Sequence, residues 1–249
     1  MLASYFKIVL RQLRSIYSFI NLIGLVAGLS VFVLIYLWVM HELSYDRFHP
    51  AYENTYRITK KQFNEKGEVY PVALSPGPLG PYVESTLPEV EQTCRLVQVE
   101  LLLRHEEKAY YHTGLAADRS LFELFHFPVL QGEVNSFNQG VDKIILTQKL
   151  ATSYFGDSDP VGKMFTLVGR DLMVAGVIED VPTNTHIQFD YVIPFEFLKT
   201  TGLQNIDTWE WNSYHTYLSV KDTKQVSEIE GKITEALIAH DPETKTQIA

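Results

Sequence analysis

Cysteine is almost missing from this sequence, since Cys94 is the single one among 249 residues. One thiol cannot form an intramolecular disulfide, and it offers no second thiolate for a zinc or redox pair, which argues against a disulfide scaffold and a structural zinc centre. Positive charge is also scarce: the net charge is −9, and no basic stripe interrupts the acidic majority. Because an acidic surface repels phosphates, nucleic acid is excluded as a partner.

Sequence motifs for catalysis and nucleotide binding are missing as well. The string nearest to a P-loop, Gly156 to Met164, has its first glycine one position too early and ends on a residue without the hydroxyl group that binds magnesium. His41 and Glu42 begin an HExxH pattern, but Tyr45 stands where the second histidine must bind zinc. A GxSxG nucleophile motif is absent. We therefore predict no catalytic residue, no metal ligand and no cofactor, and we do not expect an enzyme.

For two groups of side chains we prefer a structural interpretation to a functional one. The densest metal-like group is interpreted as solvated charges around a hairpin turn; it consists of His105, Glu106, Glu107 and His112. A late aromatic group is interpreted as core and rim side chains rather than a sugar-binding platform; it consists of Trp209, Trp211, Tyr214 and Tyr217.

What the sequence does contain is one long apolar run. Phe19 to Met40 holds no charged residue, and 22 residues at about 1.5 Å each cross a hydrocarbon core of roughly 30 Å. A cleavable signal peptide normally has an apolar region of about 7 to 15 residues followed by a small-x-small site, which is absent near Met40. The run therefore predicts an uncleaved transmembrane helix, over residues 16–43.

The charges on either side of this run predict its orientation. Lys7, Arg11 and Arg14 precede it, whereas Glu42 and Asp46 follow it. Basic residues stay on the cytoplasmic side of a membrane helix. We expect the amino terminus in the cytoplasm, the helix in the cytoplasmic (inner) membrane, and the main domain in the periplasm or outside the cell; the residues after Met40 carry a net charge of −12.

The first fifteen residues, 1–15, are expected to form a cytoplasmic amphipathic helix. Apolar residues recur at helical spacing on one face, and the three basic residues occupy another. The basic face either contacts anionic lipid headgroups or meets a cytoplasmic partner, and both interpretations stay open.

A stripe of small and polar residues runs along the predicted membrane helix. Asn21, Gly24 and Gly28 are spaced i, i+3 and i+7 and therefore share one face. Small residues let helices approach closely in lipid, and a polar side chain there favours a packed interface. We predict that this stripe packs against a transmembrane helix of a second copy or of a related permease.

Beyond the membrane segment, strands and short helices follow one another. Strands are expected at 55–63, 68–74, 90–105, 109–113, 143–146, 163–168, 172–179, 189–195 and 214–221. Helices are expected at 76–85, 118–125, 147–155 and from Val226 onward. This order predicts an α+β fold in which 44–249 forms one extracytoplasmic domain of two subdomains. A discontinuous βαβ-type subdomain would comprise 44–105 and 209–249, and 106–208 would be inserted into it.

Several strings in this order and spacing resemble the FtsX-like permease subunits of ABC transporters, with their MacB-like periplasmic core domain. The strings are HELSYDRFH (41–49), NTYRITKKQ (54–62), PGPLGPYVESTLPEVEQTCR (76–95), ADRSLFELFHFPVLQGE (117–133), IILTQKLATSYFGDSDPVGK (144–163) and VAGVIEDVPTNTHIQFDYVIP (174–194). Physically they are packing and turn devices, since glycine and proline end helices and permit turns within them.

The resemblance implies a permease subunit of an export or mechanotransmission complex that transmits the motion of a separate cytoplasmic ABC ATPase to its extracytoplasmic domain. It implies further partners: a second permease as dimer, membrane lipid, and a periplasmic adaptor or lipoprotein substrate. Such permeases continue into three further transmembrane helices, so we expect the chain to be a truncated or fragmentary permease. The alternative is a membrane-anchored sensor or interaction module without transport activity; a membrane-tethered hydrolase has only scattered histidines and acids in its favour.

Overall fold

A computed structural model of the chain describes residues 16–47, 49, 52–63, 68–134, 137, 140–240 and 246–248. The chain divides into two compact units, Met1–Tyr45 and Asp46–Ala249. The amphipathic helix expected at 1–15 lies outside the described residues, as do its basic residues Lys7, Arg11 and Arg14.

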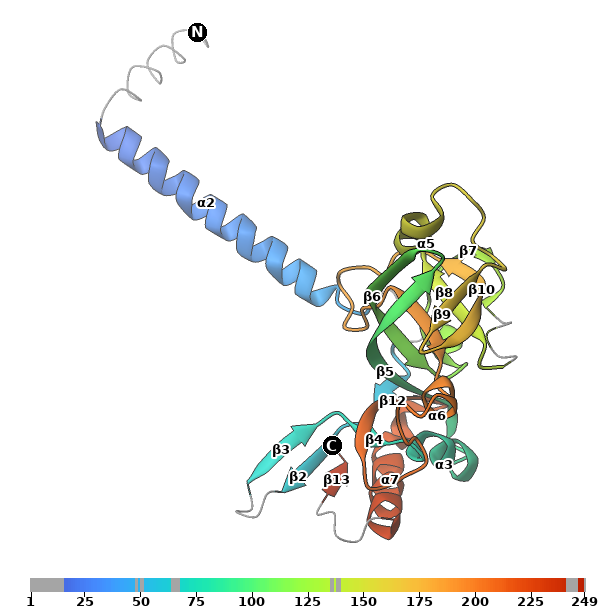
Figure 1. The fold of residues 1–249 in the computed structure, drawn as a ribbon. Coiled ribbons are helices and arrows are strands. Elements are labelled where there is room, and N and C mark those ends of the chain that lie inside the picture. Colours follow the sequence, from blue (N-terminus) through green and yellow to red (C-terminus); the bar gives the residue numbers. More distant parts are fainter. Residues whose placement is uncertain are drawn as a thin grey trace. The chain divides into compact units, whose positions relative to one another are not determined.

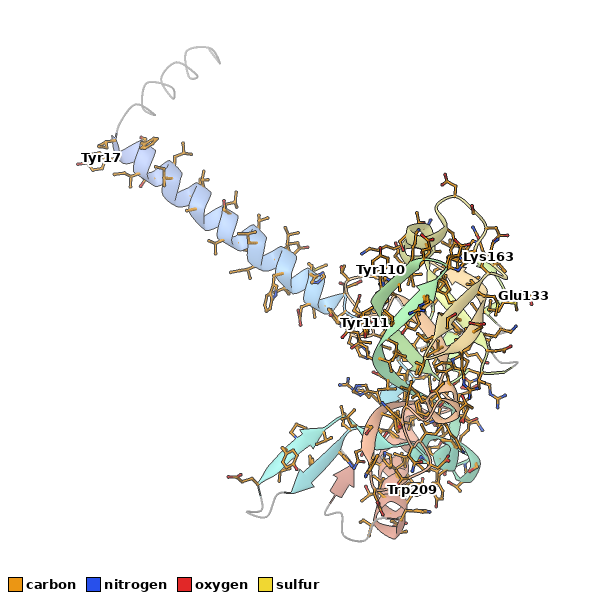
Figure 2. All side chains as sticks on the ribbon, viewed as in Figure 1. Tyr17, Tyr110, Tyr111, Glu133, Lys163 and Trp209 are labelled. Atoms are coloured by element: carbon orange, nitrogen blue, oxygen red, sulfur yellow. The ribbon has the colours of Figure 1, made fainter. Side chains whose placement is uncertain are left out.

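The first unit contains the helix α2 (Ile16–Leu43), which is apolar on every side. Its side chains project into open space all around the axis (Figure 2), and none of them is buried. At 28 residues it is about 42 Å long, so it exceeds the roughly 30 Å hydrocarbon core. Among the described residues it is the one helix long and apolar enough to cross a membrane. The expected apolar helix at the amino-terminal end is confirmed.

The second unit is a mixed α+β domain, as expected from the sequence (Figure 1). Its strands are β1 (Thr55–Arg57), β2 (Lys60–Phe63), β3 (Val69–Val72), β4 (Ser75–Pro76), β5 (Val90–His105), β6 (Lys108–Ala117), β7 (Val129–Gly132), β8 (Lys143–Thr147), β9 (Met164–Leu167), β10 (Arg170–Ile178), β11 (Tyr191–Pro194), β12 (Asn212–Val220) and β13 (Thr246–Ile248). Its helices are α3 (Leu79–Thr86), α4 (Leu121–Leu124), α5 (Gln148–Phe155), α6 (Phe197–Thr200), the 3-10 turn η2 (Thr223–Gln225) and α7 (Val226–His240).

The large sheet runs in the order β1-β12-β5-β6-β11-β8-β10-β7 and closes on itself. Closure comes from β9, which pairs with β10 on one side and with β5 on the other, so that β5, β6, β11, β8, β10 and β9 form a ring. Most pairs are antiparallel, whereas β6 with β11 and β8 with β10 are parallel. The sheet is therefore mixed, and a separate small sheet has the order β13-β2-β3.

Three buried apolar clusters hold the domain together. The first draws residues from every strand of the ring, including Phe165 and Tyr191, and therefore fills it. The second contains Cys94 and Tyr217 together with phenylalanines around α4. The third packs α3 and α7 against β12, with Ile233 of α7 among its members. The amphipathic helix expected from Val226 onward is therefore confirmed, and its apolar face meets the sheet.

Some expected elements differ in detail, because pairing with distant segments decides them. The strand expected at 55–63 is split, since β1 pairs with β12 whereas β2 pairs with β3 in the other sheet. Residues 75–76, expected to begin a helix, instead form β4 beside β12. The turn between the strands expected at 163–168 and 172–179 is shorter and begins earlier than their bounds imply: Val168 and Gly169 both have positive φ, and Arg170 already pairs with Leu167. Two residues with positive φ suit the tight right-handed twist of a two-residue hairpin.

Candidate functional site

The residues predicted to pack helices lie along α2. Nothing lies within 4 Å of a Cβ atom added at Gly24 or Gly28. The stripe of Asn21, Gly24 and Gly28 stays a prediction. Lys7, Arg11 and Arg14 lie outside the described residues.

The metal-like group lies on one hairpin, with His105 at the end of β5, Glu106 and Glu107 in the turn, and His112 on β6. His105 contacts the Met164 carbonyl oxygen through Nδ1 at 2.8 Å, while His112 contacts the Tyr154 hydroxyl through Nε2 at 3.2 Å. Within the described part of the chain, no three potential metal ligands cluster together. These side chains make separate local contacts.

The late aromatic residues are core and rim side chains, as interpreted from the sequence. Tyr214 and Tyr217 are buried. Trp209 stacks on His240 of α7 with ring centroids 4.0 Å apart, whereas Trp211 is exposed.

Asp46, soon after α2, makes several polar contacts with the loop 184–186. Asp46 has a φ of 57° and donates its backbone N–H to the Asn184 carbonyl oxygen at 3.0 Å. Its Oδ1 accepts from the Thr185 hydroxyl at 2.5 Å and from the His186 backbone N–H at 3.2 Å. Its Oδ2 lies 2.6 Å from His186 Nδ1. The carboxylate thus holds the loop 184–186 by three contacts in addition to the backbone bond.

Electrostatics favour the ionised form of Asp46. Burial raises the pKa of its carboxyl, but the hydrogen bonds from Thr185 and His186 outweigh this effect, and the net pKa is lowered. His186 also contacts the Tyr217 hydroxyl through Nε2. Burial raises the pKa of Tyr217 to about 12, so its hydroxyl keeps its proton at neutral pH. A chain of hydrogen bonds from Tyr217 through His186 to Asp46 follows.

His49, three positions after Asp46, makes a second set of contacts between this segment and the rest of the domain. Its side chain is buried, and its Nδ1 accepts the backbone N–H of His126 at 3.0 Å. The ring meets Phe125 and Phe127 edge-on, with centroids 5.1 and 5.6 Å apart. Burial lowers the pKa of His49 to about 4, so the ring is neutral at pH 7. We call Asp46, His49, Thr185, His186 and Tyr217 the junction site.

The junction site borders a cavity of about 390 Å³. The lining residues are Asp46, His49, Tyr52, Thr55, Arg57, Leu124, Phe125, His186 and Tyr217. Every one of them belongs to the second unit. The volume of the cavity lies within the range of small-molecule sites in proteins, which is about 300 to 1,000 Å³.

A buried ion pair ties other parts of the domain together. Arg95 contacts both carboxylate oxygens of Asp118, at 2.8 and 2.9 Å, and donates to the Gly77 carbonyl oxygen at 2.9 Å. Its guanidinium carbon lies 4.2 Å from the ring centre of Phe195. Burial alone lowers the pKa of Arg95, but Asp118 offsets this and the net pKa is raised. This pair fixes the chain before α3 to β5, to the end of β6 and to the chain after β11.

Sequence reasoning missed the roles of Asp46, His49, Thr185 and His186, although all four lie within strings that carry the family resemblance. Asp46 and His49 belong to the string 41–49, and His186 belongs to the string 174–194. We interpreted both strings as packing and turn devices. The structure shows that they are two halves of one site, brought together across 139 positions between Asp46 and Thr185.

A known family profile and several solved structures match this chain. The sequence profile described as the MacB-like periplasmic core domain matches residues 18–236. A domain of a permease protein from Porphyromonas gingivalis is 18% identical, with a TM-score of 0.67, over 80% of this chain and 90% of that one. The extracellular domain of the noncanonic ABC-type transporter YknZ from Gram-positive bacteria is 18% identical, with a TM-score of 0.59, over 79% of this chain and 100% of that one.

A third similar structure is the periplasmic region of MacB from Actinobacillus actinomycetemcomitans. It is 13% identical, with a TM-score of 0.58, over 79% of this chain and 88% of that chain. Identities this low show a shared fold, and no curated protein sequence matches the chain. The profile, however, covers most of the sequence, from within α2 into α7. The chain therefore belongs to the family of MacB-like periplasmic core domains of ABC transporter permeases.

Proposed function

We propose that the chain works as a permease subunit of an ABC-type export or mechanotransmission complex. In this proposal, a separate cytoplasmic ATPase moves α2, and α2 moves the domain that follows it. The proposal also retains the orientation expected from the charges, with the amino terminus in the cytoplasm and Asp46–Ala249 on the far side of the inner membrane. Family membership supports a role beside an ATPase.

One observation carries the mechanical part of the proposal: the chain is fixed to the domain immediately after the helix ends. Only two residues separate Leu43 from Asp46. A fully extended chain spans at most about 3.6 Å per residue, so Asp46 stays within about 11 Å of Leu43. A longer flexible linker would absorb a displacement of the helix, whereas this short one passes it to Asp46.

The hydrogen bonds of Asp46 then distribute such a displacement. They reach the loop 184–186, which leads directly into β11, a strand of the ring. His49 reaches His126, just after α4, from the same segment. Hydrogen bonds to a charged group contribute about 1.5 to 3 kcal/mol when buried, and less here because Asp46 is one-third exposed. Two attachments on separate elements resist rotation better than one.

Co-purification and ATP hydrolysis test this function. The chain should co-purify with an ABC ATPase from detergent-solubilised membranes. Asp46→Ala should leave that association intact and should abolish transport or signalling output while ATP hydrolysis continues. Asp207→Ala is the matched control, since it removes an exposed carboxylate that pairs with Lys199 at 2.6 Å. If no ATPase associates with the wild-type chain, the proposal fails.

The dimer belongs to this proposal as well. Single cysteines placed along α2 should cross-link most efficiently at the face of Asn21, Gly24 and Gly28, because small residues allow the closest approach. Val26 faces elsewhere on the helix and serves as the control. Equal cross-linking at all positions would contradict a packed interface at this stripe.

A further inference from the structure

An apolar groove of about 420 Å³ lies on the outer surface of the ring. Leu101 and Leu103 of β5 point into the ring, because both belong to the apolar cluster that fills it. Side chains alternate along a strand, so Leu102 between them points outward. Three further apolar side chains line the groove, and they are exposed rather than packed: Tyr111 of β6 at 67%, Val168 at 45% and Leu203 at 38%.

These apolar side chains form one patch. Tyr111 lies directly opposite Leu102 in the antiparallel pairing of β5 with β6. Val168 directly follows β9, which pairs with the other side of β5. Contiguous exposed apolar side chains on a protein surface mark a contact with another molecule. We call Leu102, Tyr111, Val168 and Leu203 the outer patch, and all four belong to the second unit.

Two charged side chains flank Leu102 along β5. Glu100 and Arg104 line the groove and are exposed, and each is two positions from Leu102, so the three share the outward face. Four residues of strand separate the acid from the base by about 13 Å. Among the described residues, neither has an oppositely charged group within 4.0 Å. Both charges are therefore available to a partner molecule.

The order of acid, leucine and base along β5 is complementary to itself. A second copy can face the outer patch across a two-fold axis that lies between the two faces, perpendicular to β5 at Leu102. The two β5 strands then run antiparallel, and Glu100 of each copy lies opposite Arg104 of the other. Facing sheets pack about 10 Å apart, a separation that a glutamate and an arginine side chain together can bridge. The same rotation brings the two outer patches against each other.

We propose that the outer patch is a face through which two copies of this chain associate, with two Glu100–Arg104 ion pairs on either side of Leu102. The charge order is the reason to prefer a second copy, because an unrelated partner would not require acid and base to be placed symmetrically about the apolar centre. The interface deepens the proposed function, since it adds a contact between the domains of the dimer. It needs neither the ATPase nor the stripe along α2.

Cysteine cross-linking of the full chain in detergent micelles measures this contact. Leu102→Cys, treated with a short bismaleimide, should give a covalent dimer in high yield, because the two thiols lie beside the two-fold axis. The native Cys94 should not react, because it is fully buried. Lys224→Cys is the matched control: this position is exposed on η2, outside the outer patch, and gives the yield of random collisions.

Charge reversal in the Leu102→Cys chain tests the pairing. Glu100→Arg alone and Arg104→Glu alone each place like charges opposite each other, and each should lower the association constant of the dimer about tenfold or more. A mixture of the two variants places two arginines opposite two glutamates, so the mixed dimer should form about as well as the dimer with the original charges. Glu91→Arg is the matched control, since it makes the same charge change at an exposed position of β5 about 30 Å from Glu100.

Several outcomes would overturn the proposal. They are a dimer yield at Leu102→Cys no greater than at Lys224→Cys, a yield that neither charge reversal changes, and a mixture that does not recover. An increased yield with Glu100→Arg alone would show that like residues face each other, which contradicts the proposed axis. Adducts with a different membrane protein, without a dimer of this chain, would show that the outer patch binds another partner and that the assignment to a second copy is wrong.

Two further measurements separate this interface from folding and from the proposed function. Equal melting temperatures show that the variants are folded. Should a charge reversal fail to fold, Glu100→Gln and Arg104→Gln decide, because each removes both ion pairs without repulsion and should lower the association constant about threefold. Cross-linking along α2 that persists while Leu102→Cys gives no dimer would overturn this interface alone and leave the proposed function intact.

Discussion

Acidification from pH 7 to pH 4 should destabilise the domain through His49. The backbone N–H of His126 can only donate, so Nδ1 of His49 must remain unprotonated to accept it. Protonation would remove this acceptor and would place a positive charge between Phe125 and Phe127. Both effects oppose the charged form of the ring in the folded state, and burial lowers its pKa to about 4.

The magnitude follows from the difference between the two pKa values. In the unfolded chain His49 has a pKa of 6.5, and between this value and about 4 the unfolded state binds a proton that the folded state does not. Stability is therefore complete above pH 6.5 and falls as the pH drops toward 4. At about 1.4 kcal/mol per unit, the loss reaches about 3 kcal/mol. For a domain of this size, about 2 to 4 °C per kcal/mol gives a fall in melting temperature of about 6 to 12 °C.

Circular dichroism of the full chain in detergent, scanned between pH 7.5 and pH 4, measures this effect. His49→Gln, which retains an acceptor but does not titrate, should flatten the dependence by that amount. His215→Gln is a useful comparison, because burial also lowers the pKa of His215 and the two contributions should add. If the His49→Gln variant loses stability with acid as steeply as the wild-type chain does, the argument from burial is wrong.

Other substitutions test the packing. Arg95→Met should cost about 3 to 5 kcal/mol because it leaves the Asp118 carboxylate partly buried without its partner; chemical denaturation should show less than additive loss when Asp118→Leu is combined with it. Gly77→Ala should lower the free energy of unfolding by about 1 to 3 kcal/mol, because its Cβ atom would lie 1.9 Å from a backbone oxygen. Gly231→Ala on α7 has open space for its Cβ atom and should raise the free energy of unfolding by about 1 kcal/mol in the same assay. Thr147→Ala should lower the melting temperature through a loss of about 1 kcal/mol, because its hydroxyl caps α5.

Local sequence patterns predicted those helices and strands that are determined mainly by their own residues. The strand expected at 90–105 has the bounds of β5, since a long alternating run of branched residues suits only one conformation. The helix expected at 147–155 is α5, which Thr147 caps and Gly156, with a φ of 58°, ends. The apolar run predicted α2 in the same way.

Pairings between distant segments could not be predicted in this way. Ring closure by β9 depends on a contact of Leu167 with Leu103, and nothing in the four residues of β9 specifies that partner. The junction site also depends on residues that are distant in the sequence. Asp46 and His186 each resemble ordinary turn residues in the sequence, and they meet although 140 positions separate them. The family resemblance includes the strings 41–49 and 174–194, but the tertiary contacts that join them cannot be inferred from either string alone. The division of the domain into subdomains at 44–105, 106–208 and 209–249 stays a prediction.

The measurement that tests the account most directly is a distance between spin labels on the domains of two copies, recorded with and without ATP in the reconstituted complex. We expect ATP to shift this distance in the wild-type complex. In Asp46→Ala the shift should disappear although ATP is still hydrolysed, because the carboxylate contacts that hold residue 46 to Thr185 and His186 are lost. The same ATP-dependent shift in wild type and Asp46→Ala would contradict the claim that the junction site passes motion from the helix to the domain.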